Sequence, residues 1–187
     1  MPSLSEADQR AALRLARTAV AEAVSHRKLP DVFPREGVFA ERCGVFVTLH
    51  VRNRLQGCIG VIEAKEPLGE AIIRCAASAA MEDPRFAPMR ADQLAELSIE
   101  ISLLSAMEPI APEAVKIGHH GLLVQLHAQR GLLLPQVAIV HRLTREQFLD
   151  ETCRKAGLPR EAWRDPEAHL FGFTCEVFSE SSHREGA

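Results

Sequence analysis

The chain has 187 residues, a length that suits one domain with its own core and leaves little for a second independent domain. Its 22 basic and 25 acidic residues are dispersed, with a formal net charge of −3, and form no basic stripe of the kind that binds a nucleic-acid backbone. The longest apolar stretch, Gly131 to Val140, is broken by Pro135 and Gln136 and is far shorter than the roughly 20 residues of a membrane-spanning helix. Neither nucleic acid nor a membrane is therefore an expected partner.

Cysteine usage and the amino terminus indicate a reducing compartment. The first residues have neither the basic region nor the apolar core of an export signal, so a cytoplasmic location is expected. The five cysteines are widely spaced, odd in number and without a C-x-x-C pair, which argues against a disulfide framework and a zinc knuckle. We expect reduced thiols, most of them in the core. The eight histidines lack the spacing of known ligand motifs, and no metal or cofactor is predicted.

Two helices are predicted in the first half of the chain. Ser5 resembles a helix-start signal, and apolar residues recur at helical spacing from there to about Val24. A loop over residues 30–42 follows. Pro67 suits the first turn of a second helix that continues to Met81. Its predicted apolar stripe is Leu68, Ile72, Cys75, Ala76 and Ala79.

A β-hairpin is predicted between these helices. Apolar and polar residues alternate over 45–51, and Arg52-Asn53 suits a tight turn into the second strand. Because successive side chains of a strand point to opposite faces, the second strand is expected to carry two separate sets of side chains. One set is Leu55, Ile59 and Val61, and the other is Gln56, Cys58 and Ile62.

The second half of the chain is predicted to contain strands and one long helix. A short polar helix near residues 90–96 leads into a strand over 98–103 that is polar on one side. A second hairpin is expected over 122–134, with its turn at Gln129-Arg130-Gly131. Thr144 with Gln147 forms a capping box for a helix that ends at Gly157.

The last predicted strand runs from about Leu170 to Phe178, with one face made of Phe171, Phe173, Cys175 and Val177. The polar tail over 179–187 is expected to be disordered. These elements predict an α/β protein, close to the α+β class, with a mixed or largely antiparallel sheet flanked by helices. A single domain over residues 1–178 is expected.

Several segments occur together, in a fixed order, over nearly the whole chain. They are Gly44-Val45-Phe46-Val47-Thr48-Leu49, Leu55-Gln56-Gly57-Cys58-Ile59-Gly60, Asp83-Pro84-Arg85-Phe86, His120-Gly121, Arg130 to Val137, and Lys155-Ala156-Gly157-Leu158-Pro159. This ordered set resembles the AmmeMemoRadiSam system protein A family, also known from the AMME-syndrome chromosomal region. The resemblance implies a larger α/β lobe, a smaller β-rich lobe, and a cleft between them near Cys58. It also implies a Memo-type protein and a radical S-adenosylmethionine protein as partners.

One position departs from the family's pattern. The signature usually reads Leu-Arg-Gly-Cys-Ile-Gly, whereas this chain has Gln56 at the position of the arginine. An amide cannot replace a charged, forked donor, so an anion held by that arginine would lose the contact or find it elsewhere. The substrate or ligand is expected to differ accordingly.

Cys58 is the leading candidate for chemistry. Gly57 and Gly60 flank it and would let another backbone or a ligand approach the strand closely. A thiolate at Cys58 could act as a nucleophile, and the alternative is a buried thiol in a tightly packed strand. His120, in the family's His-Gly pair, is the candidate base, and the alternative is a turn histidine bonded to the backbone. The adjacent His119 is expected to point elsewhere if the segment is extended.

Three further residues are candidate binding groups. Asp83 precedes Pro84, which ends the helix before it, and is expected to cap backbone amides. Arg85 either binds a carboxylate or phosphate or pairs with an acidic neighbour. Glu100, on the polar side of its strand, is a minor candidate for an acid or base, and a solvated carboxylate is the simpler interpretation.

Two classes of function remain open at this point. The first is an enzyme that uses Cys58, with His120 assisting, on a small molecule linked to the two implied partner proteins. The second is a non-catalytic binding or adaptor protein, in which the Cys58 strand and the Asp83 loop form a surface for a partner or metabolite. The glycine-flanked cysteine favours the first.

Overall fold

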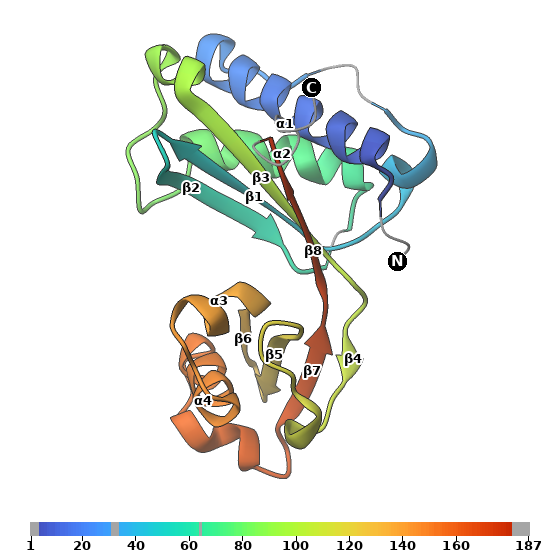
Figure 1. Cartoon of the computed structure of the whole chain (residues 1–187), viewed down its shortest axis with the longest axis vertical. Helices are drawn as coiled ribbons and strands as arrows, with labels where there is room; N and C mark the ends of the chain where they lie inside the picture. Colours follow the sequence, from blue (N-terminus) through green and yellow to red (C-terminus); the bar gives the residue numbers. More distant parts are fainter. Residues whose placement is uncertain (1–3, 31–33, 64, 181–187) are drawn as a thin grey trace. The chain divides into compact units, whose positions relative to one another are not determined.

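The computed structural model describes residues 4–30, 34–63 and 65–180 (Figure 1). The described chain divides into two compact units. Unit 1 runs up to Leu104 and resumes at Glu176, and unit 2 comprises Ser105–Cys175. Across these described residues, no helix has both the length and the apolar character needed to cross a membrane.

Helices α1 (Glu6–His26) and α2 (Leu68–Met81) cover one face of the sheet of unit 1 (Figure 1). As predicted, the Ser5 hydroxyl caps α1 by accepting the N–H of Asp8. The second helix begins directly after Pro67, and its predicted stripe is buried. Because α2 is rich in alanine, α1 and the sheet approach it closely, and nearly all of its faces are in the core. Two short 3₁₀ helices, η1 (Gly37–Ala40) and η2 (Ala91–Glu96), complete the helical part of this unit.

The sheet of unit 1 has the order β2-β1-β3-β8, with β2 at one edge. Its strands are β1 (Val45–Val51), β2 (Arg54–Val61), β3 (Leu97–Leu104) and β8 (Cys175–Ser179). The first two form the predicted hairpin, and its turn residues Arg52 and Asn53 both have positive φ, as the commonest two-residue hairpin turn requires. Both β2 and β3 run antiparallel to β1. The prediction of a largely antiparallel sheet is therefore confirmed.

The two faces of this sheet differ in polarity. On the face beneath the helices, Val45, Val47 and Leu49 of β1 are fully buried and pair with apolar residues of β3. A β-bulge then breaks the regular alternation of β2, because Leu49 pairs with Gly57 and His50 pairs with Leu55, which leaves Gln56 as the extra residue. Leu55 consequently shares the face of Cys58, and its predicted grouping with Ile59 and Val61 is wrong.

Unit 2 has its own sheet, of order β4-β7-β5-β6, and its own helices (Figure 1). The strands are β4 (Glu108–Pro109), β5 (Gly121–Leu126), β6 (Gln129–Leu133) and β7 (His169–Phe173). The helices are α3 (Pro135–Val140) and α4 (Arg145–Lys155), with the 3₁₀ helices η3 (Pro112–Ala114) and η4 (Arg160–Arg164). The capping box of Thr144 with Gln147 starts α4 as predicted, and Gly157 follows its end with positive φ. Helix α3 was not predicted.

Two strand predictions need correction. The second hairpin turns at His127 and Ala128, before the predicted position, because His127 itself adopts the left-handed conformation that the two-residue turn needs. The predicted strand from Leu170 to Phe178 is two strands, β7 and β8, which belong to different sheets and are separated by Thr174. In β8 it is Phe178 that enters the core, so Val177 points to the opposite face. Ser179 closes β8, and the rest of the predicted tail beyond residue 180 lies outside the described residues.

Candidate functional site

The Cys58 segment lies on the edge strand β2, and a side-chain pair binds its outer backbone groups. The N–H of Cys58 donates to Asp83 Oδ2 at 2.9 Å, and the C=O of Cys58 accepts from Arg85 Nη2 at 3.1 Å. Asp83 and Arg85 thus satisfy the donor and acceptor that a neighbouring strand would otherwise bind. The edge of the sheet is closed at this residue.

This arrangement fixes how Cys58 faces its neighbour on β1. Its N–H and C=O point away from β1, so Cys58 and its partner Thr48 form a non-hydrogen-bonded pair, the type in which facing side chains lie closest. The Thr48 hydroxyl accordingly donates to Cys58 Sγ at 3.2 Å. Sequence analysis did not single out Thr48, although its position in the alternation of β1 would have placed it on the polar face.

Asp83 and Arg85 form a clamp that is buried at one end and open at the other. The Asp83 carboxylate is 2% exposed and also accepts from Nε and Nη2 of Arg85, at 2.9 and 2.7 Å. The guanidinium and the N–H of Cys58 hold the pKa of Asp83 well below its usual range, against the opposing effect of burial. Asp83 therefore binds backbone amides as predicted. Arg85 pairs with this acidic neighbour, and its side chain remains 56% exposed.

The space in which a side chain on Gly57 or Gly60 would lie is filled by other atoms of the protein. A Cβ on Gly57 would lie 2.0 Å from the carbonyl oxygen of Ala79, because the backbone of α2 approaches the strand there. A Cβ on Gly60 would lie 2.3 Å from the ring of Phe46, which covers that glycine. Either another backbone or a ligand was expected to approach this strand closely, and at Gly57 the structure shows another backbone.

Gln56, at the family's arginine position, binds a loop of its own unit. Its Nε2 donates to the carbonyl oxygen of Ala87 at 2.9 Å, in the loop that also contains Asp83 and Arg85. Because Gln56 is the extra residue of the bulge, its side chain is free of the strict alternation of β2. The amide therefore ties the bulge to the clamp loop.

The other cysteines are less suited to nucleophilic chemistry at neutral pH. Burial raises the pKa of Cys43 and of Cys75 to about 11. Burial also raises the pKa of the Cys153 thiol. The thiolate is the reactive form, so a raised pKa makes these thiols slow. Cys58 is a partly exposed residue, as are Cys43 and Cys175.

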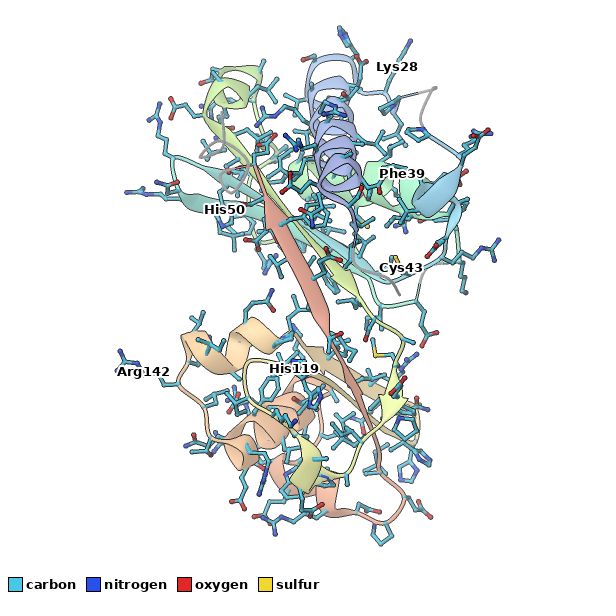
Figure 2. The ribbon with its side chains drawn as sticks, turned by 45° about the vertical axis from the view of Figure 1, so that its right-hand side comes forward. Lys28, Phe39, Cys43, His50, His119 and Arg142 are labelled. Carbon is cyan, nitrogen blue, oxygen red and sulfur yellow. The ribbon has the colours of Figure 1, made fainter. Side chains whose placement is uncertain are left out.

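His120 lies in unit 2, in the loop before β5. Its Nδ1 accepts the backbone N–H of Lys116 at 3.1 Å, which assigns the ring proton to Nε2. Burial lowers the pKa of His120, with the nearby charge of His119 and Lys116 acting in the same direction. His119, labelled in Figure 2, and His120 lie at a turn with their rings 4.7 Å apart, so the extended segment in which His119 was expected to point elsewhere does not form. A role of His120 in the chemistry of Cys58 stays a prediction.

Glu100 lies on the same face as Cys58. Thr48 pairs with Cys58 on one side and with Glu100 on the other, so the three residues form one row across β2, β1 and β3. Within the described residues, no group of three or more histidine, cysteine or carboxylate side chains is placed to hold a metal. Two surface hollows of about 540 and 460 Å³ lie within unit 1 and unit 2 respectively, and neither is lined by Cys58 or His120.

A match to a protein-family model identifies the family of this chain. Residues 13–178 match the model described as AMMECR1. The chain belongs to the AMMECR1 family. A protein of Methanothermobacter thermautotrophicus is 41% identical over 187 residues, which cover 95% of this chain and 96% of the relative. A protein of Thermoplasma acidophilum is 42% identical over 177 residues, which cover 90% of this chain and 85% of the relative.

The chain is also similar to a protein of known structure. The crystal structure of an uncharacterized protein from Pyrococcus horikoshii is 39% identical to this chain, with a TM-score of 0.82. The match covers 90% of this chain and 89% of that protein. The AMMECR1 fold assignment therefore rests on sequence and structure together.

Proposed function

We propose that this AMMECR1 protein is a cysteine-dependent enzyme that acts on a small molecule, with Cys58 as its nucleophile. The observation that carries the proposal is the environment of Cys58. Its outer backbone N–H and C=O are held by Asp83 and Arg85, its sulfur accepts a hydrogen bond from Thr48, and the residue stays partly exposed. A reactive group held in one geometry by surrounding contacts is what nucleophilic catalysis requires.

Acyl transfer is the reaction class that this arrangement suits. The Cys58 sulfur attacks the acyl carbon of a donor, the bond from that carbon to the leaving group breaks, and a thioester forms. A second nucleophile then takes the acyl group and releases the thiol. The proposal rests on Cys58 and does not require His120, because the hydrogen bond from Lys116 to Nδ1 assigns the proton of that ring to Nε2.

Arg85 supports an anionic substrate. Its Nε and Nη2 bind Asp83 and the backbone of Cys58, while the side chain as a whole is 56% exposed next to the thiol. A guanidinium in that position attracts a carboxylate or phosphate on the substrate. Since Gln56 cannot supply such a charge, Arg85 is the proposed anion-binding group of this member of the family.

The proposal extends to the setting in which the protein works. The resemblance to AmmeMemoRadiSam system protein A supports a cytoplasmic role beside a Memo-type protein and a radical S-adenosylmethionine protein. In this setting the substrate is a small molecule that one of them makes or consumes. Co-purification with each protein, repeated with Cys58→Ser, separates binding from chemistry.

Timed alkylation tests the proposed nucleophile. In the folded protein we expect iodoacetamide to label Cys58 before Cys43, Cys75 and Cys153, whose pKa values are raised, and before Cys175. Peptide mass spectrometry at short times gives the rate at each position, and Cys175→Ser is the matched control at another partly exposed cysteine. If Cys58 reacts last, or only after unfolding, it is a packing residue and the proposal fails.

A binding or adaptor function is the second candidate, and one observation favours it. On the face of the sheet that carries Cys58, Leu55 and Val177 are 42% and 41% exposed. Apolar side chains exposed near the signature suit contact with a partner protein. Under this alternative, Cys58→Ser keeps partner binding and Leu55→Ser loses it.

A further inference from the structure

The helix-free face of the unit 1 sheet carries a histidine that sequence analysis did not consider as a base. His50 belongs to β1, on which it alternates with the buried Leu49 and follows Thr48 by two residues (Figure 2). The alternation therefore places His50 on the same face as Thr48. Its cross-strand partners are Leu55 on β2 and Ser98 on β3.

His50 is a regular diagonal neighbour of Glu100, and it lies diagonally from Cys58 across the bulge at Gln56. Each of these residues pairs with Thr48, one from β2 and one from β3. Diagonal neighbours on one face of an antiparallel sheet have Cα atoms about 7–8 Å apart, which long and aromatic side chains can span. A thiol, an imidazole and a carboxylate thus surround one central threonine, all within unit 1.

The burial of these residues suits chemistry better than packing. On the opposite face of β1, Val45, Val47 and Leu49 are fully buried, whereas Thr48, His50, Cys58 and Glu100 are only partly so. By register, the charged and titratable groups nearest His50 are the thiol of Cys58 on β2, the carboxylate of Glu100 on β3, and the ion pair of Arg52 with Glu96 at the end of the hairpin. His50 therefore lies one row along the sheet from both a proton donor and an anion.

We infer that His50 is the catalytic base of the Cys58 site, with Glu100 as the group that positions it. This inference rests on the proposed nucleophilic role of Cys58. The thiol proton passes from Sγ to an imidazole nitrogen of His50, which gives a thiolate and an imidazolium. The carboxylate of Glu100 faces that positive charge. When the thiolate attacks and the leaving group departs, the imidazolium returns the proton to the leaving group.

The assignment also explains why the base need not come from the His-Gly pair. The Nδ1 of His120 is committed to the backbone of Lys116, and the residue belongs to the other unit. His50 lies two residues along the same strand from the threonine that already binds Cys58 Sγ. The nucleophile, its hydrogen-bond donor and its base then come from one hairpin.

Chemical rescue tests the inference. Full-length wild type, His50→Ala and the control His26→Ala, whose histidine is exposed at the end of α1, are alkylated with iodoacetamide at pH 7, and the rate at Cys58 is followed by mass spectrometry. We expect His50→Ala to slow Cys58 alkylation about tenfold, below the 10²–10⁴ of a full catalytic base because this reagent is already reactive. Added imidazole should restore most of the rate, and His26→Ala should match wild type.

The outcomes separate this inference from the proposed function. If wild-type Cys58 is no faster than the other thiols, the nucleophile itself is wrong. If wild-type Cys58 is fast and His50→Ala is equally fast, only the role of His50 is overturned. A slow His50→Ala that imidazole does not rescue also overturns it, because a structural histidine behaves in that way. Should His50→Ala fold poorly in thermal melts, His50→Gln is measured in its place, and an unchanged rate in that variant overturns the inference.

Discussion

Val45, Val47 and Leu49 of β1 are fully buried beneath helices α1 and α2, whereas the residues between them lie partly exposed on the opposite face of the same strand. The buried face is wholly apolar, and the open face carries Thr48, His50 and, from the neighbouring strand, Cys58. A strand with a period of two can therefore stabilise the fold with one set of residues and present reactive groups with the other. In β1 the buried residue Leu49 and the partly exposed Thr48 and His50 are separated by single peptides.

The two glycines of β2 also face opposite sides of the sheet. Gly57 faces the backbone of α2, and Gly60 faces the ring of Phe46 on the open side. A backbone atom cannot move away without moving its helix, whereas an aromatic ring can rotate. The cost of a substitution should therefore depend on which face receives the new atom.

The largest expected effect comes from Gly57→Ala. The new Cβ would lie 2.0 Å from the Ala79 carbonyl, so the strand and α2 must separate. We expect a loss of about 3 kcal/mol, at the upper end of the range for overpacked cores. For a chain of this length that lowers the Tm by roughly 6–12 °C. Thermal melts followed by circular dichroism measure the change.

Gly60→Ala and Gln56→Ala are the matched controls on the same strand. Gly60→Ala should cost less than Gly57→Ala, because the Phe46 ring absorbs part of the clash, although a Cβ there would also lie 2.5 Å from the Val45 carbonyl. Gln56→Ala loses one exposed hydrogen bond and should cost least. Equal melting temperatures for all three variants would show that the packing of α2 against β2 is not as tight as described.

Sequence alone could predict the features that depend on residues near in the chain, and not those that depend on contacts between elements. The alternation of β1, the capping signal at Ser5 and the apolar stripe of α2 depend on residues that are near in sequence, and the structure has them where they were expected. The bulge at Gln56 was missed because it depends on pairing between two strands, and one extra residue moved Leu55 to the other face. The roles of Gly57 and Gly60 were likewise hidden, since Ala79 and Phe46 are contacts made through the fold.

The second largest expected effect concerns Asp83, which binds the outer N–H of Cys58 at the edge of β2. Asp83→Asn keeps the shape of the side chain but loses the charge that binds Arg85 and the N–H of Cys58. We expect a loss of about 2 kcal/mol at pH 7, the range for hydrogen bonds to a charged group. Urea unfolding at several pH values gives the stability of both proteins.

The pH dependence has a defined sign. The pKa of Asp83 is lower in the folded protein than the value of about 3.9 for an unfolded chain, so the contribution of the clamp is complete above that value and is lost as the pH falls toward the folded pKa. The gap between wild type and Asp83→Asn should therefore narrow below about pH 4. Asp92→Asn is the matched control, because Asp92 also pairs with an arginine two residues away but is 68% exposed, and solvent screens that pair. If the two variants behave alike, burial of the clamp has no energetic consequence.

Unit 2 illustrates a different limit of sequence analysis. The capping box at Thr144 predicted the start of α4, because both partners lie within one turn. The switch from β7 to β8 was not predicted, because Phe173 and Cys175 continue one apolar alternation while the chain leaves one sheet for another at Thr174. Alternation in a sequence reports which face a residue occupies, and says nothing about which sheet it joins.

The smallest expected effect on stability belongs to Thr48→Val, and it separates the two faces most sharply. The substitution keeps the branched shape on the partly exposed face, so the melting temperature should change little, whereas Val47→Thr, one residue earlier, buries a hydroxyl in the core and should cost about 2 kcal/mol. The reactivities should show the reverse order. Losing the hydroxyl that donates to Cys58 Sγ removes a hydrogen bond of about 1 kcal/mol, which corresponds to roughly fivefold slower alkylation of Cys58. Val47→Thr leaves that bond intact, so at temperatures where it stays folded its Cys58 should react at the wild-type rate. If Thr48→Val leaves the Cys58 rate unchanged, or if Val47→Thr slows it equally, then the open face does not set the reactivity of the thiol.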